Sequence, residues 1–296
     1  MAPLCASIRA LGLATAPVVV VLAAGSCGRS ALPTTTPEAT GPREQGVQLR
    51  YRSTPAPLRH ELELDVTHTS LGLYLEAKIA IEATLSTTLK GRALSTEWTV
   101  QQVSALELVG TVDERDDQGI RTVLTDHGGS SGRADDRGFL HDGTSHEGLV
   151  RAATDAGLSA AAVVLLTAID QHARLPLLPE DALAPNVPVE HEEESETVLT
   201  DLGTVLPTTT VVRYTLRGVD ELGVAEIAIE RASVAESGPE AEGEPMQRQT
   251  RATGMLLFDV ERGLPVSLEL SQTEQIVVGE QEVERTVLVR SRYRSP

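Results

Sequence analysis

The chain has 296 residues, a formal net charge of −18 and only 2% aromatic residues. That length allows one large β domain, or two smaller ones, with a hydrophobic core. The negative charge repels nucleic acid and anionic membrane surfaces, and the few scattered aromatic residues do not form a stacking surface for bases or sugars. The core is therefore expected to consist of Val, Leu, Ile and Ala, and no nucleic-acid partner is expected.

Residues 1–26 have the layout of an export signal. Arg9 supplies a positive n-region, an apolar stretch from Ala10 to Ala24 follows, and small residues then lead to Cys27. The stretch has about 15 residues and contains Pro17, which is short for a membrane-spanning helix and typical of a signal h-region. We therefore predict a cleavable signal peptide.

The end of this segment, Ala24-Gly25-Ser26-Cys27, resembles the lipobox of bacterial lipoproteins, in which small residues precede a cysteine whose thiol receives a lipid. The family favours Leu where this chain has Ala24. Cys5 lies within the signal, so Cys27 is the only cysteine of the predicted mature chain and cannot form an intrachain disulfide. We expect Cys27 to carry the lipid anchor (diacylglycerol and palmitate-type acyl groups). The alternative is an ordinary secretory signal in which Cys27 has no role.

The resemblance also has consequences for location. Gly28, rather than Asp, follows the cysteine, and in lipoproteins of double-membrane bacteria this implies delivery to the outer membrane, with the domain in the periplasm. Residues 27–46 are rich in Pro, Thr, Gly and Ala and show no periodicity, so they are predicted to form a disordered tether.

Residues 47–296 are predicted to form one β-rich domain, and strands are expected over 47–125. Apolar and polar residues alternate strictly in Leu58–Thr67 and Leu73–Leu85, the pattern of antiparallel strands with one buried face. Weaker strands are predicted at 94–103 and 105–112. A polar turn over 113–119 is predicted to lead into a last strand, Ile120–Thr125.

The period changes after a loop predicted over 126–148. Apolar residues recur at helical spacing from about Leu149 to Ala173, and Gly157 is a point where this helix can divide. Its apolar part is too short to span a membrane, and the consecutive apolar residues Val163–Leu166 require cover on more than one side. We therefore predict a buried helix that lies against the concave face of a sheet.

A second series of strands is predicted over 187–293. Its last members form hairpins that turn at Gly263 and at Gly279. The acidic run His191–Glu194 is typical of a solvated edge strand that resists edge-to-edge pairing. The predicted strands lie near 187–199, 208–216, 224–234, 246–260, 266–278 and 281–293.

These elements predict a mainly β (α+β) fold: a curved antiparallel sheet or half-barrel with one internal helical region packed on its apolar face. The order of elements, the lipobox and the run G-x-x-x-F-D-x-x-x-G-L-P (Gly254 to Pro265) are similar to uncharacterised bacterial lipoproteins. The resemblance implies the architecture of the lipoprotein-localisation-factor half-barrels. The resemblance spans about residues 47–293 and implies a concave apolar face that can hold acyl chains, but it identifies no ligand-binding residue.

One loop carries possible metal ligands. His127, His141 and His146 lie among several carboxylates within residues 126–147, and imidazole with carboxylate is the ligand set of zinc. No H-E-x-x-H or comparable spacing is present, so a solvated loop is the favoured interpretation. The strand-helix alternation that surrounds a hydrolase nucleophile is also missing, and the chain contains no P-loop, no dinucleotide fingerprint and no C-x-x-C pair. No catalytic residue and no cofactor are therefore predicted.

Three hypotheses remain. The first is a monomeric, non-catalytic binding or carrier module for an apolar ligand or an envelope protein, tethered to the membrane by its N-terminal lipid. The second is a structural or assembly lipoprotein whose helix fills the half-barrel. The third is a metal-dependent hydrolase that uses the His/Asp loop 126–147. An open apolar pocket favours the first hypothesis and a filled groove the second. Seven residues are predicted to share one core: Leu62, Leu64, Ile79, Ile81, Val212, Ile227 and Leu268.

Overall fold

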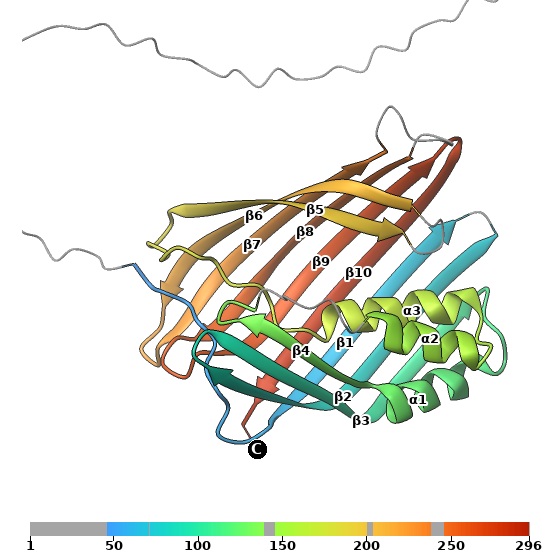
Figure 1. Ribbon diagram of the computed structural model, residues 1–296. Helices are drawn as coiled ribbons and strands as arrows, with labels where there is room; N and C mark the ends of the chain where they lie inside the picture. The colour runs from blue at the N-terminus through green and yellow to red at the C-terminus, as the bar shows by residue number, and fades with distance from the viewer. Residues whose placement is uncertain (1–45, 71, 139–145, 200–203, 238–245, 296) are drawn as a thin grey trace, which may run out of the picture. The chain divides into compact units, whose positions relative to one another are not determined.

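The computed structural model describes residues 46–70, 72–138, 146–199, 204–237 and 246–295. Its ten strands form one antiparallel sheet in the order β4-β3-β2-β1-β10-β9-β8-β7-β6-β5, with β4 and β5 at the two edges. The sheet curves around three helices that lie on its concave side (Figure 1). The predicted curved, mainly β fold with helices on its apolar face is therefore confirmed.

The two series of strands meet where β1 pairs with β10. Gly263 and Gly279 adopt positive φ angles of 67° and 59° in the predicted hairpin turns, a conformation that costs glycine little. The first series comprises β1 (Leu58–Ser70), β2 (Leu73–Lys90), β3 (Ala93–Gly110) and β4 (Gly129–Asp135). The second comprises β5 (Pro188–Leu199), β6 (Thr204–Val219), β7 (Val224–Glu236), β8 (Met246–Asp259), β9 (Leu264–Val278) and β10 (Gln281–Arg294).

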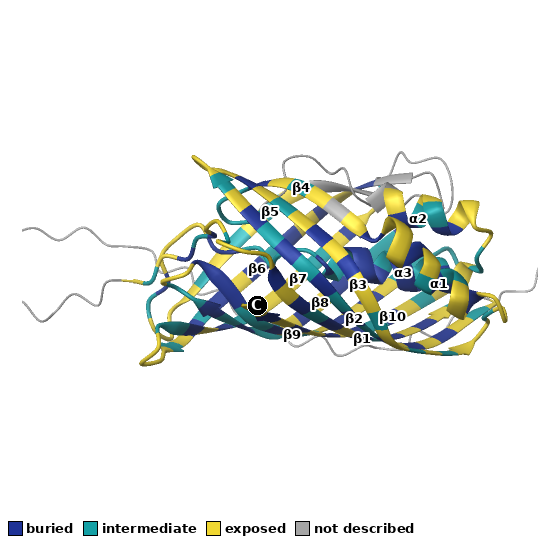
Figure 2. Ribbon diagram, turned by 90° about the horizontal axis from the view of Figure 1, so that it is seen from below, coloured by how far each residue is buried: buried dark blue, intermediate teal, exposed yellow. Residues whose placement is uncertain are grey.

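Burial alternates residue by residue along most strands, as Figure 2 shows by its blue and yellow bands. In β1 the even-numbered residues from Leu58 to His68 are buried, and their odd-numbered neighbours face solvent or are half-buried. The acidic residues Glu190, Glu192 and Glu194 are exposed on the edge strand β5. The predicted solvated edge is thus confirmed, and the register places one face of every long strand on the concave side.

The predicted helix from Leu149 to Ala173 is present but divided. It forms α2 (His146–Asp155) and α3 (Ala160–His172), with Gly157 at a φ of 64° in between. Ser159 caps α3, because its Oγ accepts a hydrogen bond from the backbone N–H of Ala162 at 3.2 Å. The capping residue is tied in turn to Asp116, whose carboxylate accepts a bond from the Ser159 backbone N–H at 3.1 Å.

One predicted strand is wrong. Ile120–Thr125 belongs to a helix, α1 (Asp116–His127). Its buried residues Ile120, Val123 and Leu124 recur at helical spacing, and two acidic residues occupy the first turn. The predicted loop over 126–148 also contains the short strand β4, which pairs with β3. The two strands predicted at 94–103 and 105–112 are one strand, β3, whose register with β2 shifts at two bulges.

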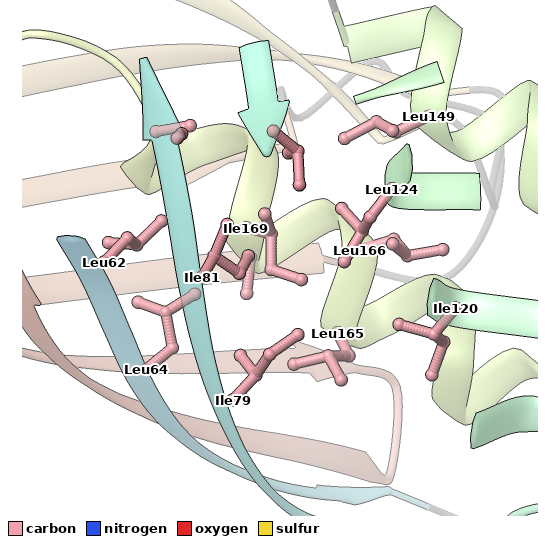
Figure 3. Close-up of a cluster of buried hydrophobic side chains, with 14 of the residues drawn as sticks. Leu62, Leu64, Ile79, Ile81, Ile120, Leu124, Leu149, Leu165, Leu166 and Ile169 are labelled. Atoms are coloured by element: carbon pink, nitrogen blue, oxygen red, sulfur yellow. The ribbon is translucent and has the colours of Figure 1, made fainter. Parts of the chain in front are cut away.

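The seven predicted core residues are all buried, but they belong to two clusters rather than one. The helix-covered core joins α1–α3 to β1, β2, β3 and β10, and Leu62, Leu64, Ile79 and Ile81 lie in it (Figure 3). The loop-covered core contains Val212, Ile227 and Leu268, and it is closed by residues 47–51 and 175–183 instead of by a helix. In the loop-covered core, the hydroxyl of Tyr51 donates a hydrogen bond to the carbonyl of Pro176 at 2.6 Å.

The helix α3 lies against β1 and β2 on its inner side and against α2 on another side. Leu165 and Leu166 are fully buried, whereas Val163 and Val164 are half-buried. Helix cover on more than one side is therefore confirmed. None of the helices in the described residues is long and apolar enough to cross a membrane.

Residues Glu44–Pro296 form a compact unit of their own. This unit contains all the strands and helices described above, together with the helix-covered core and the loop-covered core. It therefore has the parts that a domain needs to fold independently.

Candidate functional site

A cavity of about 550 Å³ opens on the concave face beside the end of α3. Its volume lies within the range of roughly 300–1,000 Å³ that small-molecule sites occupy. One wall is the end of α3 with the segment that follows, including His172, Arg174, Leu175 and Leu177. The other wall is the inner face of β6, β7, β8 and β9.

The strand register arranges this inner wall in layers. Tyr214, Ile229 and Leu270 lie level with one another across β6, β7 and β9 and form an apolar layer. Two residues further along β7 is Arg231, level with Val212, Ala252 and Gln272. The next inward level consists of hydroxyl side chains. They are Thr210, Ser233 and Thr250, and Thr210 donates a hydrogen bond to Ser233 at 3.0 Å.

Arg231 therefore lies where the cavity wall changes from apolar to polar. Water reaches Arg231 through the cavity. Protein still surrounds its guanidinium, and this burial lowers the pKa of Arg231 from its ordinary value. The nearby Tyr214 and Glu193 raise the pKa and offset part of that effect. Glu193, on β5, is the acidic residue of the cavity wall. No side chain that the structure describes forms an ion pair with Arg231.

The other arginines of this region have carboxylate partners. Arg174 pairs with Asp170 at 3.2 Å, and Arg248 pairs with Glu274. Glu274 is 4% exposed and is shared with Arg285 on the neighbouring strand. A buried carboxylate held between two guanidiniums has its charge compensated, so the Arg248–Glu274–Arg285 network is a structural element of the wall.

His172 contributes an unsatisfied polar atom at the end of α3. Its Nε2 is buried and has no hydrogen-bond partner among the described residues. Burial first, and then the nearby charges of Arg285 and Arg231, lower its pKa from 6.5 to about 4. The imidazole is thus neutral at neutral pH, and a buried polar atom of this kind requires an explanation.

A second histidine is buried in the helix-covered core and has a different surrounding. His60 accepts a hydrogen bond at Nδ1 from the indole N–H of Trp98 at 2.9 Å and stacks on Tyr293 with ring centroids 4.4 Å apart. Burial lowers its pKa to about 4. These aromatic rings are packed in the core and form no exposed stacking surface.

The residues singled out from sequence lie only in part within the described residues. Cys27 and His141 lie outside the described residues. His127 is exposed at the end of α1, and His146 belongs to α2, although its side chain is not described. In the described parts of the chain, no group of three or more His, Cys, Asp or Glu is placed to hold a metal ion.

A second hollow, of about 480 Å³, is formed by charged residues near the start of the domain. Arg137 pairs with Asp135 at 3.0 Å and with Glu180 at 3.2 Å, and Arg50 lies 3.7 Å from Asp136. Three arginines face three carboxylates there, since Arg92 also lines it. The charges balance, which is the arrangement of a surface ion-pair network and not of a ligand site.

The cavity residues were not predicted from the sequence as a site. They come from β5–β9 and from the end of α3, and only the sheet topology brings them together. One signal was present, because Arg231 interrupts the apolar inward series Ala225, Ile227, Ile229 of its own strand. A charged residue on the buried face of an amphipathic strand is an exception to the pattern, and such exceptions often mark functional positions.

No known protein family, no curated protein and no solved structure matches this chain.

Proposed function

We propose that this protein is a non-catalytic binding or carrier module of the cell envelope. Its half-barrel cavity holds an apolar ligand, and a lipid on Cys27 tethers it to the outer membrane, with the domain in the periplasm. The observation that carries the proposal is the cavity of about 550 Å³ under β6–β9, which α3 leaves open.

The distribution of cover on the concave face supports binding over a purely structural role. Helix α3 packs on β1 and β2, so the helix fills only its own half of the curved sheet. On the other half, Val212, Ile229, Leu268 and Leu270 are apolar and border the open cavity. Apolar walls with a few convergent polar groups are typical of small-molecule sites.

The proposal is tested with the domain 44–296 and the uncharged fluorophore N-phenyl-1-naphthylamine. We expect saturable binding to the folded domain. Ser233→Trp fills the cavity from β7 and should weaken binding at least about ten-fold, because bulk replaces the space for the ring. Ala232→Trp is the matched control, since Ala232 is the exposed neighbour on the opposite face of the same strand. Absence of binding by the folded, unmodified domain would favour the structural role instead.

The tether is tested separately in the full chain. Cys27→Ser removes the thiol that the lipid requires, and we expect the protein to leave the membrane fraction of fractionated cells. If the Cys27→Ser protein stayed in the membrane fraction after processing of its signal, the anchor would not be the lipid.

A further inference from the structure

We infer that the cavity is specific for a single-chain amphiphile with an anionic head group, whose carboxylate or phosphate pairs with Arg231 while its alkyl chain lies along the apolar layer. This inference rests on the proposed binding function and identifies the class of ligand. Three independent observations lead to it.

The first observation is the layered wall. Inward residues of β6, β7 and β9 at the level of Ile229 are apolar, and those two levels further along are hydroxyls on β6, β7 and β8. Arg231 lies between the two. Beyond the hydroxyl level, Leu206, Ala235 and Met246 form a small further apolar cluster. An apolar level next to a hydrogen-bonding level matches a molecule with a tail and a head, whereas a purely apolar ligand would leave the polar level unpaired.

The second observation is the charge. The chain carries a net charge of −18, yet the cavity is lined by three arginines (Arg174, Arg231 and Arg248) and one carboxylate (Glu193). His172 is neutral there at neutral pH because its pKa is lowered to about 4. Arg174 and Arg248 are compensated by Asp170 and Glu274, so the positive charge that attracts an anion to this surface of a negatively charged molecule is that of Arg231.

The third observation is the pairing of the arginines. Arg248 and Arg174 are compensated by Glu274 and Asp170, so Arg231 is the guanidinium of the described cavity wall that is left to pair with a ligand. His172 lines the same cavity, but its Nε2 is buried and is not counted as a ligand contact. A carboxylate or phosphate can accept hydrogen bonds from the Arg231 guanidinium, and such charge-assisted bonds are among the stronger ones in proteins.

The experiment compares ligands that share one chain and differ in the head group. Laurate, dodecyl phosphate, dodecanol and dodecylamine each compete with N-phenyl-1-naphthylamine for the folded domain 44–296. We expect the two anions to bind at least about ten-fold more tightly than the alcohol, and the amine to bind most weakly. Inorganic phosphate and acetate should not compete, because the chain supplies the apolar burial. If only inorganic phosphate and acetate competed, the cavity would be a site for free anions, and the inference of an amphiphilic ligand would be wrong.

Arg231→Gln identifies the counter-ion. We expect this variant to bind dodecanol as the unmodified domain does and to lose the preference for laurate and dodecyl phosphate. Arg231→Lys keeps the charge and should retain part of the preference. Arg251→Gln is the matched control. Arg251 is exposed on the outer face of the adjacent strand β8, so this substitution removes the same charge without changing the cavity. It should leave the preference unchanged.

The outcomes separate the inference from the function on which it rests. If the fluorophore and dodecanol bind but the anions show no advantage, the cavity is a site for uncharged ligands and the inference is wrong. If the anions are preferred equally by the unmodified domain and by a folded Arg231→Gln domain, Arg231 is not the counter-ion. If the folded domain binds none of these molecules, the proposed function itself fails. A circular dichroism melt checks the fold of each variant, and the head-group series on the unmodified domain tests the inference even if Arg231→Gln does not fold.

Discussion

The inward residues of the concave face are covered in different ways in the two halves of the sheet. Under β1, β2 and β3 most inward residues are aliphatic, and α1, α2 and α3 cover them with residues such as Ile120, Leu165 and Ile169 (Figure 3). The exceptions are His60, His68, Thr87 and Trp98. Under β6, β7 and β8 only one end is sealed, by the chain segments 47–51 and 175–183. Beyond that end the wall becomes polar at Arg231 and the cavity opens.

This difference separates stability from binding. A strand face that is mainly aliphatic gains free energy by burial, at about 25 cal/mol per Å² of apolar surface. A strand face that carries hydroxyl side chains and an arginine without an ion-pair partner among the described residues gains little by comparison. The helix-covered half is therefore expected to hold the fold together, and the open half to bind.

The largest effect is expected for Leu165→Asp in the helix-covered core. Leu165 is 0% exposed, so the substitution places a carboxylate among aliphatic side chains. The free energy of unfolding should fall by more than about 4 kcal/mol, or the domain should not fold at all. Urea titration followed by circular dichroism measures this. Val109→Asp, at a residue 58% exposed on β3, should stay within about 0.5 kcal/mol. A Leu165→Asp domain that melts normally would mean that α3 does not lie on the sheet.

A pair of identical truncations compares the two halves directly. Ile79 on β2 is 2% exposed under α3, and Ile229 on β7 is 9% exposed and borders the cavity. Ile79→Ala should cost about 4 kcal/mol and Ile229→Ala about 2 kcal/mol, the upper and lower parts of the range for this substitution. The reason is that Ile229 already faces open space and loses fewer packing partners. Equal losses in urea titrations would indicate that the cavity is closed in solution.

The strands of the second series were the easier part to predict from sequence, since the six ranges predicted over 187–293 correspond to β5–β10, and the errors lie in the helix-covered half. The alternation over Leu58–Thr67 and Leu73–Leu85 and the helical spacing after Leu149 are strong local signals, and they identified β1, β2 and the α2–α3 region. The prediction of a strand at Ile120–Thr125 was wrong because a short apolar run fits both the helical and the strand period, and its β-branched residues favoured a strand. The strand β4, with the sequence GSSGRAD, has little propensity of its own and exists because it pairs with β3.

The cavity could not have been predicted in the same way. His172, Arg231, Arg248 and Gln272 are far apart in sequence, and each one alone has an ordinary explanation as a surface or strand residue. Only the register of β7, β8 and β9 brings the last three to one wall, and only the direction of α3 places His172 opposite them. Sequence periodicity predicts which face a residue occupies, but it does not say which strands are neighbours.

Acidification tests the two buried histidines, one in each environment. The pKa values of His60 and His172 are lowered from 6.5 to about 4 by burial, so the unfolded chain binds more protons than the folded domain between these pH values. Stability is therefore complete above about pH 6.5 and is lost as the pH falls toward 4, by about 1.4 kcal/mol per pH unit for each histidine. From pH 7 to pH 5 this amounts to about 2 kcal/mol each.

Urea titrations at pH 7, 6 and 5 measure that loss. His60→Phe and His172→Phe should each flatten the pH dependence, because each removes one group that gains a proton on unfolding. If the variant and unmodified domains gave parallel pH profiles, the substituted histidine would not be buried in its neutral form.

The smallest effect on stability is expected at the hydroxyl level of the open half. Thr210 and Ser233 satisfy each other at 3.0 Å, so the double variant Thr210→Val/Ser233→Ala removes donor and acceptor together and leaves neither atom unpaired. Replacing both partners by apolar groups of similar shape is close to neutral, and we expect a change in the free energy of unfolding within about 0.5 kcal/mol in either direction.

The same variant should weaken laurate binding in the competition assay, because the head group loses hydroxyls next to Arg231 while dodecanol keeps its apolar contacts. Stability that is unchanged while head-group selectivity falls would assign these side chains to the ligand. A loss of several kcal/mol would instead make them part of the structural core, and the division between the two halves would be wrong.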